Sequence, residues 1–294
     1  MPVVIVTDSS ACIPADLVEE YGIVVVPLHV LVGEHDYRDG IDDIDLDGGQ
    51  VTTSGASPAA MRDAFGEALA RSGGDGVLAV HLSREISATW DAARAAADDC
   101  LGDVRVVDSR SAGMGLGFPV LEAARAAREG AGLDAVYERA VDAATRVRAY
   151  IVVERLDQLR RGGRIGAAAA LLGTALSMKP VLHIRDGKLA LKEKTRTSTK
   201  ARARLVDLVV ARAGTGPVSL AVHHLDAAGV AEDIARQLAE RLSQVDEIFV
   251  TDFSAVLGAH VGPGAVGVVL SARDSHSPEQ PEPESSTGGD SSTG

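Results

Sequence analysis

Residues 77–107 read VLAVHLSREISATWDAARAAADDCLGDVRVV. The two ends of this stretch, Val77–Leu82 and Val104–Val107, are short apolar runs rich in valine, which predict buried strands. The segment between them, Thr89–Asp99, is rich in alanine and predicts a helix. Two strands joined through a helix form a βαβ unit, in which the strands run parallel. The stretch therefore predicts an α/β fold with a parallel sheet.

The same alternation continues in both directions along the chain. Further strands are predicted at Val3–Val6, Ile23–Val32, Ile151–Val153, Val181–Ile184, Val218–Val222, Ile248–Val250 and Val266–Leu270. Further helices are predicted at Pro14–Tyr21, Pro58–Arg71, Phe118–Glu129, Leu133–Arg148, Thr199–Ala213 and Ala228–Ser243. The nine predicted strands fit two sheets better than one, so we expect two α/β domains.

A hairpin signal in the second half interrupts the parallel pattern. The turn Asp186-Gly187 lies between the strand-like runs Val181–Arg185 and Lys188–Thr195, and Asp-Gly favours a two-residue hairpin turn. We therefore expect an N-terminal Rossmann-like domain with a mostly parallel sheet over residues 1–149. A C-terminal domain with a mixed sheet is expected over residues 150–273.

The composition changes again at the end of the chain. Residues 274–294 consist mainly of Ser, Pro, Glu, Gly and Thr, with five acidic residues and no Lys or Arg. Such a segment buries too little apolar surface to fold. We expect a disordered acidic tail there, and the sequence does not indicate its role.

The bulk composition limits the classes of function. Of the 294 residues, 46% are hydrophobic and only 3% are aromatic, so we expect a large core built mainly from Ala, Val and Leu. The net charge of −13 disfavours nucleic acid and anionic membranes as default partners. Two cysteines, Cys12 and Cys100, without metal-ligand spacing indicate a reducing compartment.

No targeting or membrane-spanning segment is recognisable. The N-terminus lacks the basic region of a secretion signal. The uncharged stretch Ile165–Met178 is shorter than the ~18 residues that a membrane span needs. We therefore expect a cytoplasmic protein without a transmembrane segment, while transient contact with a membrane stays open.

Common catalytic and cofactor-binding signatures are absent from the sequence. It contains no G-x-x-x-x-G-K-[ST], G-x-S-x-G or H-E-x-x-H motif. Gly113, Gly115 and Gly117 follow a predicted strand, but a dinucleotide fingerprint needs its third glycine one position later, where Phe118 stands. No histidine has acidic or cysteine neighbours at metal-ligand spacing. We therefore expect no metal and no cofactor.

Hydroxyl-rich loops follow several of the predicted strands. They are Thr7–Ser10, Thr52–Pro58, Ser83–Thr89 and Asp108–Gly113. Ligands of open α/β sheets bind beyond the carboxyl ends of the strands, where helix N-termini favour anions. Their only basic residues are Arg84 and Arg110, so the anion need not be a phosphate, and a single carboxylate can be held by a few neutral donors. The alternative for each loop is that its hydroxyls only cap a helix, as Ser57 before Pro58 is placed to do.

Two aspartates at strand ends open an enzymatic alternative. Asp8 and Asp108 each follow a predicted strand and could bind Mg²⁺ or act as acid and base in a phosphoryl-transfer or hydrolytic enzyme. An Asp-Ser pair after a strand more often fixes its own loop by an Asx-type hydrogen bond. Magnesium-dependent turnover by the purified chain would support the enzyme.

Basic residues concentrate between Arg155 and Arg204. That stretch holds thirteen basic residues and three acids, although the whole chain carries a charge of −13. A basic patch on an acidic protein can steer an acidic partner or a nucleotide phosphate. The alternatives are an ordinary solvated face and a nucleic-acid or regulatory module. The stretch contains no Phe, Trp or Tyr for base stacking, which disfavours nucleic acid.

Taken together, the motifs resemble those of the DegV family, which includes the fatty-acid-binding subunits of bacterial fatty acid kinase. The resemblance covers residues Val3 to Leu270. The matching motifs are VTDSSACIP at 6–14, TTSGASP at 52–58, LSREISATW at 82–90, VVDSRSAGMGLG at 106–117, LDQLRRGGRIG at 156–166, MKPVLHIRDGKL at 178–189, KTRTSTKA at 194–201 and HVGPGAVGVV at 260–269.

The resemblance implies a lipid-binding protein of phospholipid metabolism that is not itself an enzyme. One long-chain fatty acid is expected in a tunnel between the two domains. Its apolar wall could come in part from the segment Ala167–Ala170 with Leu171, Leu172, Leu176 and Met178; the alternative for that segment is an ordinary buried helix. The protein would present the carboxylate to a partner fatty acid kinase, which forms the acyl phosphate. Chain length, unsaturation, oligomeric state and the identity of the kinase are not indicated.

The family's site residues carry over to positions of this chain. The carboxylate is expected to meet Thr53, with Ser54 beside it, and Ser87, with His260 near the head group. Arg164 and Arg196 are expected on the surface where the kinase docks. The sequence departs from the family pattern at Gly55-Ala56 and at Ala88 and Trp90, which leaves the hydroxyls in place but puts the loop conformations and the preferred acyl chain in question.

Overall fold

The structure is a computed structural model that describes residues 2–46, 50–164 and 178–273. The predicted tail and most of the apolar stretch Ile165–Met178, including Ala167–Ala170, lie outside the described residues. The strands are β1 (Val4–Asp8), β2 (Val24–Val26), β3 (His29–Val32), β4 (His35–Arg38), β5 (Val51–Ser54), β6 (Val77–His81), β7 (Val104–Asp108), β8 (Val147–Val152), β9 (Lys179–Arg185), β10 (Lys188–Thr195), β11 (Val218–His224), β12 (Val245–Asp252) and β13 (Val266–Ala272). The helices are η1 (Ser9–Ala11), α1 (Ala15–Tyr21), α2 (Pro58–Ser72), α3 (Thr89–Asp98), α4 (Met114–Arg128), α5 (Leu133–Arg146), α6 (Asp157–Arg161), α8 (Ser198–Ala213), α9 (Ala228–Arg241) and α10 (Ala255–Val261).

Two main sheets confirm the predicted fold class. A four-stranded sheet in the order β2-β1-β6-β7 is parallel throughout. A six-stranded sheet in the order β10-β9-β8-β13-β11-β12 is mixed. The predicted hairpin is also confirmed, since Asp186 and Gly187 both have positive φ, 51° and 77°, between the paired strands β9 and β10.

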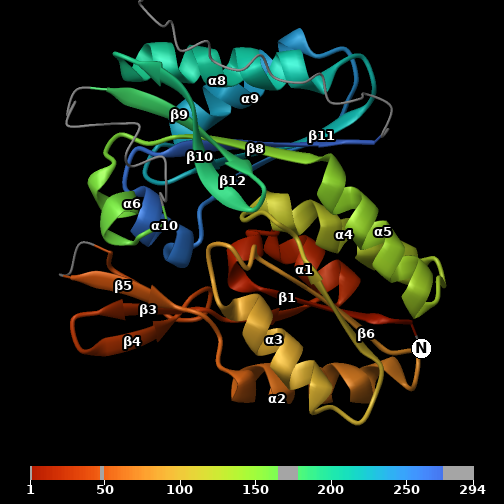
Figure 1. Cartoon of the computed structure of the whole chain (residues 1–294). Coiled ribbons are helices and arrows are strands. Elements are labelled where there is room, and N and C mark those ends of the chain that lie inside the picture. The colour runs from red at the N-terminus through yellow and green to blue at the C-terminus, as the bar shows by residue number, and fades with distance from the viewer. Residues whose placement is uncertain (1, 47–49, 165–177, 274–294) are drawn as a thin grey trace, which may run out of the picture.

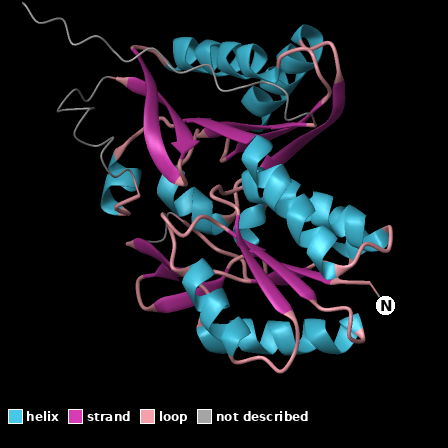
Figure 2. Ribbon diagram, turned by 45° about the vertical axis from the view of Figure 1, so that its right-hand side comes forward, coloured by secondary structure: helices cyan, strands magenta, loops and turns pink. Residues whose placement is uncertain are grey.

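Helices and sheets alternate in layers, as Figure 1 and Figure 2 show. Helices α2 and α3 cover the outer face of the four-stranded sheet, and α8 and α9 cover the outer face of the six-stranded sheet. Helices α4 and α5 lie between the sheets and contact both. Burial on two sides explains why α4 is apolar on almost its whole surface.

Helix α4 begins four residues earlier than predicted, because its glycines pack closely and do not form a loop. A Cβ added at Gly117 would lie 2.9 Å from the carbonyl oxygen of Ala11, and one at Gly115 would overlap the Ser111 hydroxyl. Glycine is therefore required there by the close approach of the helix to the η1 and Ser111 segments. The helix start then lies next to the carboxyl edge of the parallel sheet.

A third, antiparallel sheet in the order β4-β3-β5 was not predicted. The single strand expected over Ile23–Val32 is divided, with β2 in the parallel sheet and β3 in this small sheet. Pro27 lies at the break, where a residue without an N–H suits the end of a ladder. Residues Thr52–Ser54, expected in a loop, are instead part of β5, whereas Ser57 caps α2 as expected, its Oγ accepting from the Ala60 N–H at 3.1 Å.

The division of the chain into domains at residue 149 stays a prediction. The strand β8 crosses that position and belongs to the six-stranded sheet. One hydrophobic core cluster includes Val6 and Leu78 of the first half together with Ala221 and Val269 of the second. The two halves therefore share buried contacts around α4.

The carboxylate of Asp8 fixes the carboxyl edge of the parallel sheet. It is fully buried, and its Oδ1 accepts from the Ser10 backbone N–H and hydroxyl at 3.2 and 2.5 Å. Its Oδ2 accepts from the Leu82 N–H at 3.1 Å and lies 2.9 Å from His81 Nδ1. These contacts link β1 to the start of the loop after β6, which is the loop that carries Ser87.

Replacing Asp8 with alanine should lower the free energy of unfolding by about 3–5 kcal/mol, because several buried donors lose a common acceptor. Urea unfolding followed by circular dichroism measures the change. The control is Asp98→Ala, whose side chain is 72% exposed, and it should stay within about 0.5 kcal/mol of the wild type. A loss below about 1 kcal/mol for Asp8→Ala would contradict this structural role.

Candidate functional site

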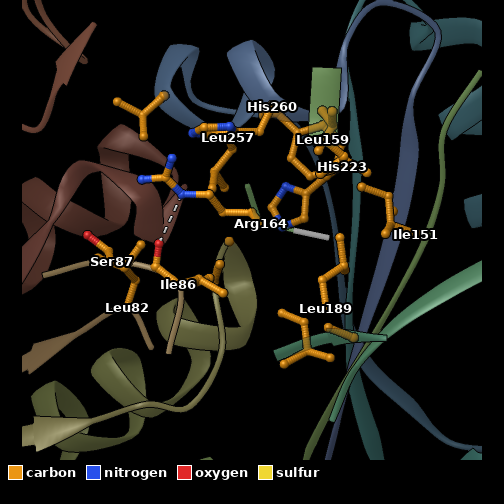
Figure 3. Close-up of a pocket in the computed structure, with 18 of the residues that line it drawn as sticks. Leu82, Ile86, Ser87, Ile151, Leu159, Arg164, Leu189, His223, Leu257 and His260 are labelled. Atoms are coloured by element: carbon orange, nitrogen blue, oxygen red, sulfur yellow. Dashed lines mark hydrogen bonds between the residues drawn. The ribbon is translucent and has the colours of Figure 1, made fainter. Parts of the chain in front are cut away.

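A cavity lies where the N-terminal and C-terminal halves of the chain meet. Its wall is mainly apolar, with Leu28, Leu82 and Ile86 from the first half. The second half adds residues of β8, β9, β10, β13 and α10, including Ile184 and Leu189. The polar side chains that line it are Thr53, Ser54, Ser87, Tyr150, Arg164, His223 and His260. Figure 3 shows Ser87, Arg164 and His260 grouped on one side and Ile151 and Leu189 on the other.

Thr53 and His260 are in direct contact at the mouth of this cavity. Thr53 Oγ1 lies 2.8 Å from His260 Nε2, although the residues are 207 positions apart. Thr53 comes from β5 of the small sheet and His260 from the last turn of α10, which packs against β3 and β5. A Cβ at Gly162 would lie 2.4 Å from His260 Nδ1, so the glycine leaves room for the ring.

The imidazole of His260 is neutral at physiological pH. Burial, followed by the positive charge of Arg164, lowers the pKa of His260 to about 4. A neutral imidazole has one donor and one acceptor nitrogen. If Nε2 carries the proton, it donates to Thr53 Oγ1, and the Thr53 hydroxyl proton is free for a ligand.

Ser87 has a comparable supporting residue, Thr89, which the sequence did not single out. The Oγ atoms of Ser87 and Thr89 lie 2.9 Å apart, and Ser87 Oγ also accepts from the Thr89 N–H at 3.3 Å. Thr89 is fully buried. When Thr89 donates its hydroxyl proton, Ser87 is left with a proton to donate into the cavity. The only sequence signal for Thr89 was a hydroxyl two positions after Ser87.

The Thr53 strand and the Ser87 loop touch at Gly55. A Cβ at Gly55 would lie 2.7 Å from Thr89 Oγ1 and 3.6 Å from Ser87 Oγ. Gly55 is one of the positions at which the sequence departs from the family pattern. Because it has no side chain, the Thr53 strand and the Ser87 loop can come into contact there. Ser54 also lines the cavity, but it is largely exposed.

The two predicted arginines occupy different places. Arg164 lines the cavity, and its guanidinium donates to the carbonyl oxygens of Ile86 at 3.3 Å and Gly162 at 2.5 Å. It thus holds the backbone next to Ser87. Arg196 is exposed between β10 and α8 and is not among the residues that line the cavity.

The aspartates of the enzymatic alternative are separated in the structure. Asp8 and Asp108 end β1 and β7, and β6 lies between these strands, which places them about 10 Å apart. Asp8 is occupied by the donors named above, and Asp108 Oδ1 accepts from the Arg110 N–H at 2.8 Å. Within the described ranges, no group of three or more His, Cys, Asp or Glu side chains could hold a metal ion. The geometry adds no support to the magnesium-dependent alternative.

The basic stretch is partly neutralised by acids. Glu154 pairs with Lys179 at 2.6 Å and with Arg202 at 3.0 Å, and Arg204 pairs with Glu193 at 2.7 Å. At the hairpin tip, Lys188 lies 3.0 Å from Glu85. In the part of the chain that the structure describes, no helix has the length and apolar character needed to cross a membrane.

Comparison with known proteins finds relatives over nearly the whole chain. Residues 2–273 match the family model described as uncharacterised protein, DegV family. A DegV domain-containing protein of Mycobacterium tuberculosis is 49% identical over 272 residues, which cover 92% of this chain and 97% of the relative. Protein DegV of Bacillus subtilis is 34% identical, over 91% of this chain and 98% of its own length.

Solved structures share the fold over nearly the whole chain. A DegV family protein of Thermus thermophilus, whose structure is described as fatty acid binding, has a TM-score of 0.87 and 32% identity, covering 92% of this chain and all of its own. The crystal structure of DegV of Bacillus subtilis, described as a fatty acid binding protein, has a TM-score of 0.84 and 32% identity, covering 93% of this chain and all of its own. On the matched residues and the shared fold, the chain belongs to the DegV family.

Proposed function

We propose that this protein binds one long-chain fatty acid in the cavity between its halves, in the cytoplasm, and is not itself an enzyme. The observation that carries the proposal is the arrangement at the cavity mouth, where Thr53 with His260 and Ser87 with Thr89 stand at the edge of an apolar interior. The fatty-acid-binding description of the Thermus thermophilus and Bacillus subtilis relatives supports it.

The energetics favour an acyl chain as the occupant. Each buried methylene contributes about 0.8 kcal/mol, so a chain of about sixteen carbons gains on the order of 10 kcal/mol before costs. The loss of translational and rotational freedom on binding and the ordering of the acyl chain cost several kcal/mol. The apolar wall therefore supplies most of the affinity, and the polar mouth fixes the direction in which the chain enters.

The head group is satisfied by neutral donors and one nearby cation. A carboxylate accepts at several lone-pair sites on its two oxygens. The hydroxyls of Thr53 and Ser87 would supply two charge-assisted hydrogen bonds, and Arg164 would compensate the charge. No lysine or metal ion is needed for this arrangement.

The carboxylate would then be presented to a partner fatty acid kinase, which forms an acyl phosphate. Arg164 beside the cavity and the exposed Arg196 would form the docking surface for that enzyme. An excess of basic residues between Arg155 and Arg204 on an otherwise acidic chain supports this, because it can steer an acidic partner.

Replacing Thr53 with valine or Ser87 with alanine should weaken fatty-acid retention by about 1–3 kcal/mol each, because a carboxylate lone pair loses its donor. Fluorescent fatty-acid displacement measures the dissociation constant. Thr52→Val is the matched control, since Thr52 is the preceding residue of β5 and does not line the cavity. Wild-type retention in both variants would mean that these hydroxyls do not hold the head group.

Fatty-acid binding should be accompanied by proton uptake at His260. The pKa of His260 is about 4 in the structure, and a carboxylate placed beside the ring raises it. The complex therefore binds more protons than the free protein, and affinity should increase as the pH falls from 8 to 6.

Calorimetric titration in two buffers of different ionisation enthalpy measures this uptake. The His260→Gln variant keeps a side-chain donor but does not titrate in this range, so its apparent enthalpy should be the same in both buffers. Equal enthalpies for the wild type in the two buffers at pH 6 would refute the coupling.

Replacing Arg196 with alanine should leave lipid retention unchanged and slow acyl-phosphate formation by the partner kinase roughly tenfold, because a charge of the docking surface is lost. Arg164→Ala should also slow phosphorylation, but it should weaken lipid retention as well, because Arg164 donates to the Ile86 carbonyl next to Ser87 and would compensate the charge of the carboxylate. Arg236→Ala, on the exposed face of α9, is the control. If Arg196→Ala lost its lipid but the lipid that remained were phosphorylated at the normal rate, Arg196 would belong to the head-group site and not to the docking surface.

A further inference from the structure

His223 is a buried polar residue in an otherwise apolar part of the cavity wall. It lies on β11 and is 1% exposed. It pairs in register with Gly267 on β13, which in turn pairs with Ile151 on β8. Paired residues point to the same face of a sheet, so these three form one row across the floor of the cavity. Figure 3 shows His223 and Ile151 away from Ser87.

Both nitrogens of the His223 ring are already engaged. Nε2 lies 2.9 Å from the Met114 backbone nitrogen, and Nδ1 lies 2.8 Å from Thr251 Oγ1. A backbone N–H can only donate, so Nε2 is the acceptor and Nδ1 carries the proton. Burial lowers the pKa of His223 to about 4, which keeps this neutral tautomer across the physiological range.

The acceptor nitrogen caps a helix that belongs to the other half of the chain. Met114 is the first residue of α4, and the preceding Gly113, with φ 59° and ψ −148°, offers no capping side chain. The first N–H groups of a helix have no partner within the helix. His223 supplies that partner from 109 positions away and so ties β11 to α4.

Neighbouring residues also pack tightly around the His223 ring. It stacks on Phe253, with ring centroids 5.2 Å apart and planes at 27°. A Cβ at Gly113 would lie 3.0 Å from His223 Nε2, and a Cβ at Gly267 would lie 3.0 Å from Phe253 Cζ. All four residues line the cavity. Since neither nitrogen is free, an acyl chain can meet only the carbon atoms of this ring.

We propose that His223 is a specificity-determining residue, which fixes the spacing between β11 and α4 and, with Phe253 and Gly267, sets the width of the acyl cavity. The inference rests on the proposed fatty-acid-binding function. Close-packed interiors do not adjust freely to a change of one methyl group. A cavity of fixed width therefore selects among straight, branched and cis-unsaturated chains.

Two substitutions should move this selectivity in opposite directions. His223→Ala removes the ring and the tie to α4, so the ratio of branched and cis-unsaturated to straight saturated chains should rise at least about threefold. Gly267→Ala adds a methyl group against Phe253 and keeps every hydrogen bond, so the ratio should fall. Mass spectrometry of lipids extracted from the purified full-length chain, all from the same culture conditions, gives the ratio.

The matched control is His224→Ala. His224 is the next residue of β11, so its side chain points to the opposite face, and it does not line the cavity. Its lipid ratio should equal that of the wild type.

The outcomes separate this inference from the function on which it rests. A wild-type protein with bound fatty acid whose ratio is unchanged in the folded variants would overturn the role of His223 alone. A wild-type protein that binds no fatty acid would remove the proposed function and this inference with it. If His223→Ala does not fold, the inference is tested with Gly267→Ala alone. An unchanged ratio of branched and cis-unsaturated to straight chains in that variant would refute a cavity of fixed width.

Discussion

A hydroxyl group has one proton, and the arrangement of the cavity mouth depends on this constraint. Thr53 and Ser87 can each donate to an anion only if their single proton is not already donated to a neighbouring residue. His260 stands 2.8 Å from Thr53, and Thr89 stands 2.9 Å from Ser87, in positions to donate to these hydroxyls. With the proton of His260 on Nε2 and Thr89 donating to Ser87, each hydroxyl keeps its proton for the proposed head group. Arg164 would compensate the charge, so the proposed site needs neither lysine nor metal.

The layered fold is what brings these pairs together. Helix α4 packs between the two sheets, and Gly113, just before its first residue, lines the cavity beside His223. The small sheet carries Thr53 towards α10, and Gly55 lets its strand touch the Ser87 loop. Contacts between residues of both halves, including the hydrogen bond from Met114 to His223, close the apolar interior. The site therefore exists only when both halves are folded and packed.

The sequence predicted the two main sheets and the hairpin, because valine-rich runs, alanine-rich helices and an Asp-Gly turn are local signals. It missed β4 and β5, whose sequences HDYR and VTTS are short and mostly polar, and it placed the start of α4 too late, because packed glycines look like a loop. Thr53, Ser87, His260 and Arg164 were proposed from the family resemblance, and all four line the cavity. Thr89 and His223 were not, since their roles depend on partners that only the fold brings close.

The most direct test of this account is a crystal structure of the protein purified together with its native lipid. We expect continuous density for one acyl chain in the cavity, with its carboxylate oxygens within about 2.5–3.0 Å of the Thr53 and Ser87 hydroxyls. An acyl chain in the reverse direction, a head group held elsewhere, or a cavity closed to lipid would contradict it.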